Sequence, residues 1–200
     1  MKFENTAVWG FEHAIRGMRN PYQSWNRSDS TFDKNGVFIG ESDLTLMQSL
    51  IRGGSEHRKF MRQIFVSVDI TAPNYWLNEF ATYKIGTTSN STSLQHTGSK
   101  RDFVVDDFEY KKSTEKALAE HLKTVNSLRE KYLLSKNYEY FEMMRELIPM
   151  GYLYTITWTG SYENLYTIYH QRKNHKLTNW KCFIEWIETL PYAKELILFE

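Results

Sequence analysis

Apolar and polar residues alternate in two segments of the chain, and this pattern predicts two β-strands. In residues 64–70, IFVSVDI, isoleucine or valine falls on every second position, so one face of the strand is strongly apolar. Residues 152–159, YLYTITWT, alternate similarly and are rich in β-branched and aromatic side chains, which strands favour. Both segments are therefore expected to be strands.

Segments with helical periodicity lie between the two predicted strands and after the second one. In residues 113–134, Leu122, Val125 and Leu128 fall on one face, which predicts a long helix. Shorter helices are expected where a capping residue, a proline or a glycine limits an apolar segment. These are residues 42–52 with Ser42 as N-cap, 73–83 entering at Pro73, 138–149 ending at Pro149, 161–172 with Ser161 as cap, and 178–190 with Thr178 as cap and Pro191 after its end.

The order of these elements predicts a helix-rich α/β or α+β fold. Residues 8–17 are interpreted as a short strand or helix, followed by an ordered loop, and residues 85–104 form a long polar segment. The sequence contains no internal repeat and no obvious linker. We therefore expect a single domain over residues 1–200.

Charge and composition narrow the class of protein. The chain has 25 basic and 24 acidic residues, so no overall electrostatic footprint for nucleic acid or a membrane surface is expected. No run approaches the ~20 apolar residues that a membrane span needs, and residues 1–10 lack the apolar core of a signal peptide. The single cysteine, Cys182, fits a reducing compartment. These features predict a soluble cytoplasmic protein that binds neither membrane nor nucleic acid.

The sequence carries no glycine-rich phosphate loop, no GxSxG motif and no HExxH motif. His170 and His175 are five residues apart, which is a poor spacing for two ligands on one helix face, so no metal site is predicted.

Two arginines and a polar run are the remaining candidates for chemistry. Arg145 lies near a helix end beside Met143 and Met144, Arg172 lies in the break between two aromatic-rich helices, and residues 87–93 read TTSNSTS. Taken alone, the arginines are consistent with surface side chains and the run with a flexible linker. Taken together, they are also consistent with a nucleotide-phosphate pocket, because arginine presents a fixed fork of donors.

Three stretches of the chain resemble the flavin-dependent thymidylate synthases. The first is VDITAPNYWLNEFATYKIGTTSNSTS, which is similar to the family's strand, helix and R-H-R-x7-S signature, with Thr82-Tyr83-Lys84 at the triplet. The second is MMRELIPMGYLYTITWT, which resembles the family's A-R-x-x-L-P-x-x-x-Y-T-x-x-x-W-T segment. The third is ENLYTIYHQRKNHKLTNWKCFIEWI, which resembles the closing R-x3-H-x2-W-E-I region. The resemblance covers roughly residues 42–195, leaving residues 1–41 as a divergent N-terminal segment.

The resemblance implies an α/β fold assembled as a homotetramer, with active sites shared between subunits. It also implies bound FAD, with NADPH and methylenetetrahydrofolate as co-substrates, and conversion of dUMP to dTMP or installation of a related 5-substituent on a pyrimidine deoxynucleotide. Two alternatives stay open. One is a flavin- and nucleotide-dependent activity of the NADPH oxidase kind. The other is a non-catalytic nucleotide-binding or assembly protein.

Site residues follow from the resemblance position by position. Arg145 and Arg172 match nucleotide-binding arginines, and Arg172 is also expected to polarise the pyrimidine. Tyr83, Lys84 and His175 match positions at the flavin. The remaining positions expected at the nucleotide are Glu79, Asn90, Ser91 and Thr92.

The chain departs from the family pattern at cationic positions. Thr82 and Tyr83 stand where the signature has arginine and histidine, and Leu94 stands at or beside a phosphate-binding arginine. Losing such a cation removes a charge-assisted hydrogen bond worth roughly 1.5–3 kcal/mol. Compensating cations are expected among Arg16, Arg19, Lys59 and Arg62.

Overall fold

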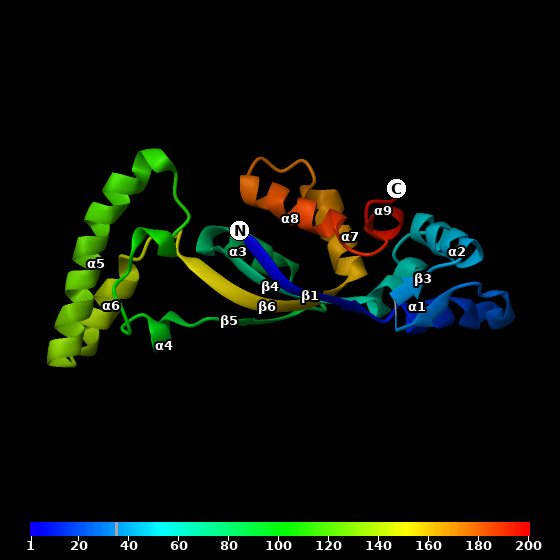
Figure 1. Cartoon of the computed structure of the whole chain (residues 1–200), viewed down its shortest axis with the longest axis horizontal. Helices are drawn as coiled ribbons and strands as arrows, with labels where there is room; N and C mark the ends of the chain where they lie inside the picture. The colour runs from blue at the N-terminus through cyan, green and yellow to red at the C-terminus, as the bar shows by residue number, and fades with distance from the viewer. Residues whose placement is uncertain (35) are drawn as a thin grey trace. The chain divides into compact units, whose positions relative to one another are not determined.

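Four strands form the main sheet of the protein, in the order β1-β4-β6-β5 (Figure 1). They are β1 (Lys2–Trp9), β4 (Phe65–Pro73), β6 (Leu153–Ser161) and β5 (Thr88–Ser91). A short hairpin of β2 (Thr31–Asp33) and β3 (Gly36–Phe38) forms a second, antiparallel sheet. The structure is a computed structural model that describes residues 1–34 and 36–200.

Hydrogen bonds between polar side chains connect the two central strands, β4 and β6, at three successive pairs of residues. The hydroxyl groups of Thr71 and Thr155 lie 2.8 Å apart. Two further pairs repeat this contact along the strands, Thr157 donating to Asp69 at 2.5 Å and Thr159 donating to Ser67 at 3.0 Å. Residue numbers rise on one strand as they fall on the other, so β4 and β6 are antiparallel neighbours in this register.

The opposite face of the same two strands is apolar. Val66, Val68 and Ile70 of β4 are buried, as are Ile156 and Trp158 of β6. Side chains in a strand alternate between its two faces. The alternation predicted for residues 64–70 and 152–159 is therefore confirmed.

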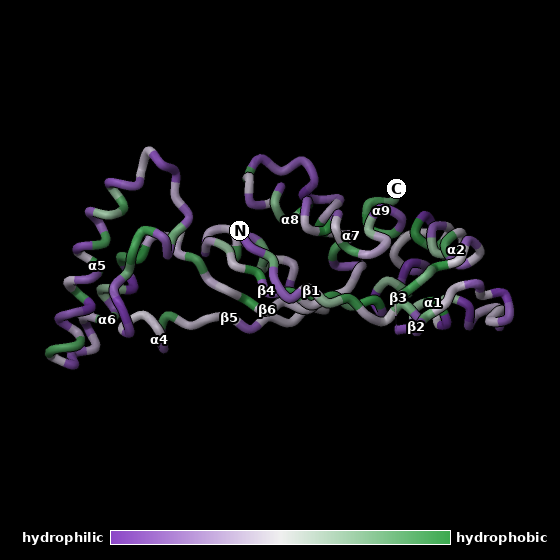
Figure 2. The backbone as a smooth tube through the Cα atoms, in the orientation of Figure 1, coloured by the Kyte–Doolittle hydropathy of each residue, from purple (hydrophilic) through white to green (hydrophobic). Residues whose placement is uncertain are grey.

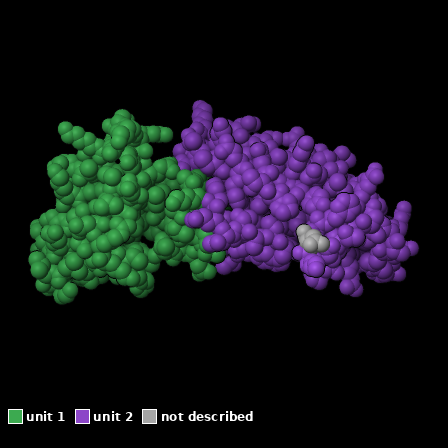
Figure 3. All heavy atoms as spheres, viewed as in Figure 1, with its two compact units in different colours: residues 1–2, 69–82, 90–157 green, residues 3–68, 83–89, 158–200 purple. Residues whose placement is uncertain are grey.

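The chain divides into two compact units, coloured separately in Figure 3. Unit 1 comprises residues 1–2, 69–82 and 90–157, and unit 2 comprises residues 3–68, 83–89 and 158–200. Strands β1, β4, β5 and β6 each contribute residues to both units. The prediction of one domain with a divergent segment 1–41 stays a prediction.

Unit 1 is dominated by a pair of packed helices, α5 (Glu115–Ser135) and α6 (Tyr138–Glu146). Figure 2 shows apolar positions recurring along α5, and its residues Leu122, Val125 and Leu128 join Phe141 and Met144 of α6 in a buried cluster. The long helix predicted over residues 113–134 is therefore confirmed. Unit 1 also contains α3 (Asn74–Phe80), α4 (Leu94–Thr97) and the 3-10 turns Val105–Asp107 and Lys112–Thr114.

Unit 2 contains most of the other helices. They are α1 (Phe11–Arg19), α2 (Glu41–Arg52), α7 (Tyr162–Arg172), α8 (Thr178–Glu188) and α9 (Ala193–Leu196), with 3-10 turns at Asn20–Tyr22, Trp25–Arg27 and Arg58–Gln63. A further 3-10 turn, Ala81–Tyr83, follows α3. Helix α7 starts at the predicted cap, where the Ser161 side chain accepts from the backbone N–H of Asn164. Its first residue, Tyr162, is buried and donates to the Pro191 carbonyl at 2.7 Å.

The predicted helix-rich α+β class is confirmed, but some details are wrong. Strands β1 and β5 and the β2–β3 hairpin were not expected. The N-cap of α2 is Gly40 and not Ser42, and the N-cap of α8 is Leu177 and not Thr178. Within the described part of the chain, no helix combines the length and apolar character that crossing a bilayer requires.

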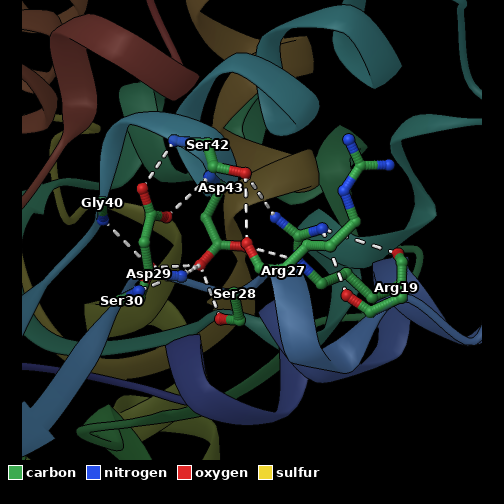
Figure 4. A network of polar contacts seen from close by, with 9 residues as sticks. Arg19, Arg27, Ser28, Asp29, Ser30, Gly40, Ser42 and Asp43 are labelled. Atoms are coloured by element: carbon green, nitrogen blue, oxygen red, sulfur yellow. Dashed lines mark hydrogen bonds and ion pairs between the residues drawn. The ribbon is translucent and has the colours of Figure 1, made fainter.

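A buried ion pair fixes the N-terminal part of unit 2 (Figure 4). The Nε atom of Arg19 donates to Oδ1 of Asp43 at 2.6 Å, and both side chains are almost completely buried. The Arg19 Nη2 atom also donates to the Ser42 hydroxyl at 3.0 Å. Arg19 thus has a structural role as the partner of Asp43. The expectation that it compensates for the cations missing from the anion site is wrong. Arg62, another expected cation, is paired with Glu163.

The loop before α2 and the start of that helix cap each other. Oδ2 of Asp43 accepts from the hydroxyls of Ser28 and Ser30 at 2.7 Å, and from the backbone N–H groups of Asp29 and Ser30 at 3.1 Å. In return, the Asp29 carboxylate accepts from the backbone N–H groups of Ser42 and Asp43, at 2.8 and 3.1 Å. Carboxylates satisfy the N-terminal N–H groups of helices well, so the loop and α2 stabilise each other.

These contacts lower the pKa of the Asp43 carboxyl group. Burial alone would raise the pKa of its carboxyl group, but hydrogen bonds from Ser30, Ser28 and Arg19, together with the Arg19 charge, hold the pKa below its ordinary value. A lowered folded-state pKa means that the carboxylate stabilises the folded protein above the unfolded-state pKa of about 3.9. That stabilisation is lost as the pH falls through the lower, folded-state pKa.

Replacing Asp43 by asparagine should lower the free energy of unfolding by about 3 kcal/mol near neutral pH, because it leaves Arg19 buried without its counter-charge. The difference between wild type and Asp43→Asn should stay constant from about pH 7 to about pH 4 and shrink only below that, as the pH falls toward the lowered folded-state pKa of Asp43. Urea unfolding across this range measures both effects. The control is Asp106→Asn, because Asp106 is exposed and its side chain makes no hydrogen bond in the described residues. A difference that does not shrink below about pH 4 would contradict the assignment.

Candidate functional site

The nine predicted site residues fall into two groups, one in each unit. Unit 2 contains Tyr83, Lys84, Arg172 and His175. Unit 1 contains the other five, which are Glu79, Asn90, Ser91, Thr92 and Arg145.

Arg172, the last residue of α7, contacts the Tyr83 hydroxyl and two aromatic rings. Its Nε atom donates to the Tyr83 hydroxyl at 2.8 Å, although the two residues are 89 positions apart in the sequence. Its guanidinium carbon lies 4.8 Å from the ring centre of Trp180 and 5.6 Å from that of Tyr83. A guanidinium in these positions gains cation–π attraction from both rings. The structure therefore brings Tyr83 and Arg172 together.

His175 joins this group through the same tryptophan. Its ring centre lies 6.1 Å from that of Trp180, and the two rings are tilted by 66°. The Nδ1 atom of His175 accepts from the backbone N–H of Leu177 at 3.2 Å. A neutral imidazole with Nδ1 as acceptor carries its hydrogen on Nε2.

Lys84 lies in an exposed turn after Tyr83. The turn is closed by hydrogen bonds from the Thr87 backbone N–H to the Lys84 carbonyl and from the Asn164 side chain to the Ile85 carbonyl, at 3.3 and 2.9 Å. Gly86 has a φ of +72°, which other residues adopt at a cost. Asn164 also takes part in the capping box of α7, so one side chain ties the Lys84 turn to the helix that ends in Arg172.

In unit 1, Arg145 lies at the end of α6 and contacts the segment that follows the polar run. Its Nη1 atom approaches the Gln95 side-chain oxygen at 3.4 Å, and the Tyr138 hydroxyl donates to the same oxygen at 3.1 Å. Tyr154 is nearby. Burial raises the pKa of its hydroxyl, an effect that Tyr152 adds to and the Arg145 charge opposes.

The polar run belongs to an ordered strand and its exit. Asn90 and Ser91 are exposed on β5. The backbone N–H of Thr92 donates to the Thr155 carbonyl at 2.9 Å, and the Thr92 hydroxyl accepts from the Thr155 N–H at 3.3 Å. The interpretation as a flexible linker is therefore wrong. Glu79 is half-buried on α3, and its backbone carbonyl accepts from the Thr82 hydroxyl at 2.7 Å.

Three contributors to these groups were missed in the sequence. Gln171 accepts from the Tyr83 hydroxyl, Gln95 contacts Arg145, and Asn164 anchors the Lys84 turn. Only Asn164 had a detectable signal, because it stands three residues after Ser161, where a capping box places its second member. Among residues 1–34 and 36–200, no group of histidine, cysteine, aspartate and glutamate could hold a metal ion.

The profile of the family "thymidylate synthase complementing protein" matches residues 11–182. The chain belongs to this family.

Solved structures support the fold. Two crystal structures of the flavin-dependent thymidylate synthase ThyX from Helicobacter pylori, both containing FAD and dUMP, are similar over 100% of this chain and 98% of theirs, with 17% identity and a TM-score of 0.73. A crystal structure of the UMP/dUMP methylase PolB from Streptomyces cacaoi, bound with 5-Br dUMP, is similar over 99% of this chain and 95% of that one, with 12% identity and a TM-score of 0.65. A search of curated protein sequences finds no match. The fold implied by the resemblance is thus confirmed.

Asn164 offers a way to loosen the Lys84 turn without disturbing α7. Asn164→Asp keeps the oxygen that accepts from Ser161 and loses the donor to the Ile85 carbonyl. We expect severalfold faster amide hydrogen exchange in residues 84–87, while the first turn of α7 stays protected because an acidic group is favourable there. Asn164→Ala should accelerate exchange in both places and cost about 1 kcal/mol of stability. Unchanged exchange in the turn of Asn164→Asp would show that this hydrogen bond does not hold it.

Proposed function

We propose that the protein is a flavin-dependent enzyme that methylates dUMP to dTMP, or installs a related substituent at C5 of a pyrimidine deoxynucleotide. The observation that carries the proposal is the family match over residues 11–182, combined with the fixed guanidinium of Arg172 at the end of α7. In this proposal NADPH and methylenetetrahydrofolate are the co-substrates. The enzyme is a cytoplasmic homotetramer with active sites shared between subunits, and it does not bind nucleic acid.

Arg172 is assigned the role of polarising the pyrimidine. A guanidinium next to a base carbonyl stabilises the negative charge that develops on the ring when C5 reacts. Such help is effective when the charge is already oriented, because no reorganisation is then needed during the reaction. The Tyr83 hydrogen bond and the Trp180 ring supply that orientation.

Arg145 and the residues around β5 are assigned to holding the nucleotide. Arg145 is exposed and shares the Gln95 side-chain oxygen with Tyr138, a contact at 3.4 Å that a phosphate oxygen would outcompete, because charge-assisted hydrogen bonds to arginine are shorter and stronger. Asn90, Ser91 and Thr92 add amide and hydroxyl groups on an ordered strand end. Glu79 is assigned to the same ligand from α3.

The residues predicted at the flavin fit such a group in their chemistry. Lys84 is an exposed ammonium that suits a diphosphate, and the His175 imidazole is fixed by the hydrogen bond that its Nδ1 atom accepts from the Leu177 backbone. Tyr83 provides an aromatic surface beside them. FAD bound there would supply the reducing equivalents, which is chemistry that the side chains of this chain cannot provide.

A second candidate function is binding of flavin and nucleotide with altered or lost catalysis, including an activity of the NADPH oxidase kind. The observation that favours it is Tyr83, which stands at a cationic position of the family signature and is engaged with Arg172. The similarity in fold to a UMP/dUMP methylase instead suggests that ribonucleotides be tested as substrates beside dUMP.

Flavin binding separates the enzyme proposals from a non-catalytic protein. The purified protein titrated with FAD should show a visible absorbance band that NADPH bleaches under anaerobic conditions. Release of tritium from [5-³H]dUMP with methylenetetrahydrofolate then separates C5 substitution from an oxidase activity. Absence of flavin binding at saturating FAD would contradict both enzyme proposals.

Replacing Arg172 by alanine should lower dUMP-dependent turnover at least about a hundredfold, which corresponds to about 3 kcal/mol of transition-state stabilisation. The measurement is the tritium-release rate at saturating FAD and NADPH, with circular dichroism to verify folding. Arg27→Ala is the matched control, because Arg27 is exposed and its side chain makes no hydrogen bond or ion pair in the described residues. Equal rates for Arg172→Ala and wild type would show that Arg172 does not act on the substrate.

A further inference from the structure

We propose that a cleft in unit 2 binds a small zwitterion with an aromatic side chain, that is, a free aromatic amino acid. The cleft is lined by residues of α1 and of the segment 25–32, and its volume is about 430 Å³. All of its lining residues belong to unit 2, and none of the nine predicted site residues lines it. The site therefore does not depend on the proposed function.

The cleft has apolar and aromatic walls. Ile15 of α1 is buried, Phe32 of β2 is half-buried, and the Trp25 ring is 49% exposed. Small-molecule sites in proteins measure about 300–1,000 Å³ and combine such walls with a few polar groups. A ligand with one or two rings matches the cleft in size, and its ring can stack on the aromatic side chains.

Side chains that line the cleft are already fixed by contacts within unit 2 (Figure 4). Arg19 is held by its ion pair with Asp43, and the Ser28 hydroxyl donates to the same carboxylate at 2.7 Å. The Trp25 indole nitrogen donates to the Asn20 side-chain oxygen at 2.9 Å, which restricts the ring. Ordered walls lose less conformational entropy when a ligand binds, so the cleft is preorganised.

Two opposite charges on α1 also line the cleft. Glu12 and Arg16 are exposed and stand four residues apart, with the acidic residue nearer the N-terminus of the helix. This spacing and order favour an ion pair on a helix. Neither side chain, however, makes a hydrogen bond or an ion pair among the described residues. Both groups are therefore available to a ligand.

The two charges select the kind of ligand. An α-ammonium group complements the Glu12 carboxylate, and an α-carboxylate can accept two hydrogen bonds from the Arg16 guanidinium. A free amino acid carries both groups on one carbon, so its side chain can enter the aromatic part of the cleft. A mononucleotide is less suited, because its phosphate would place further negative charge beside Glu12. A neutral heterocycle would leave both charges without a counter-charge.

The first test is calorimetry with L-phenylalanine, L-tyrosine and L-tryptophan as probes, and it needs neither flavin nor nucleotide. At least one of them should bind the wild-type protein with one site per chain and a Kd below about 1 mM. Analogues of the tightest binder that lack the ammonium or the carboxylate group should bind about tenfold more weakly, because each loses a charge-assisted hydrogen bond. Absence of binding by all three amino acids would overturn the proposal, as would equal affinity for both analogues.

The second test assigns each charge to its partner. Glu12→Gln should weaken the tightest binder about tenfold and remove its advantage over the analogue without the ammonium group. Arg16→Gln should do the same for the analogue without the carboxylate. The matched control is Glu4→Gln, because Glu4 is exposed in unit 2 and its side chain makes no hydrogen bond in the described residues. If both advantages persist in the variants, the two residues do not read the ligand and the proposal is wrong.

A third variant tests the aromatic wall. Trp25→Leu should weaken the tightest binder about fivefold, because a ring-stacking contact is lost. Trp9→Leu is its control, since Trp9 is 47% exposed, lies in unit 2 and stacks on Phe65. Thermal unfolding shows whether each variant folds, and the bound amino acid should raise the Tm of the wild type more than that of Trp25→Leu. Equal affinity in Trp25→Leu and wild type would contradict the assigned ligand class. If Trp25→Leu does not fold, the two exposed charge variants still decide the proposal.

Discussion

The antiparallel pairing of β4 and β6 is the constraint on which the candidate site depends. The hydroxyl and carboxylate pairs between the two strands fix their register to the residue. Each strand then runs directly into a helix, β4 into α3 and β6 into α7. A shift of one residue would move every side chain to the opposite face. It would also move the start of α7, and with it the position of Arg172 at the other end of that helix.

The central strands and the long helices could be predicted from the sequence, because their apolar residues recur with the period of a strand or a helix. Strands β4 and β6 show strict alternation over a buried face, and α5 shows a buried stripe. Strands β1 and β5 are at the two ends of the strand order and are mostly exposed. An edge strand with little burial has no apolar period, so pattern alone could not find it.

The candidate site was readable only in part. Arg172 attracted attention because of its place between two helices, but its partner Tyr83 is far away in the sequence, and no local pattern relates the two positions. Arg19 illustrates the opposite error. Its sequence surroundings resemble those of a free cation, whereas tertiary structure places it against Asp43 in a buried and fully hydrogen-bonded network. Burial of a charge is a property of the assembled fold, so helix periodicity cannot reveal it.

The hydroxyl-rich strand β5 has a consequence for self-association. Its four residues, Thr88–Ser91, are all exposed and lie at one end of the main strand order. An open strand edge can recruit another chain by backbone pairing, and proteins counter this by keeping such edges short and polar. With small hydroxyl and amide side chains in place of a long apolar run, β5 offers a poor template for amyloid-like growth. The polar composition of this strand thus guards the sheet against uncontrolled extension.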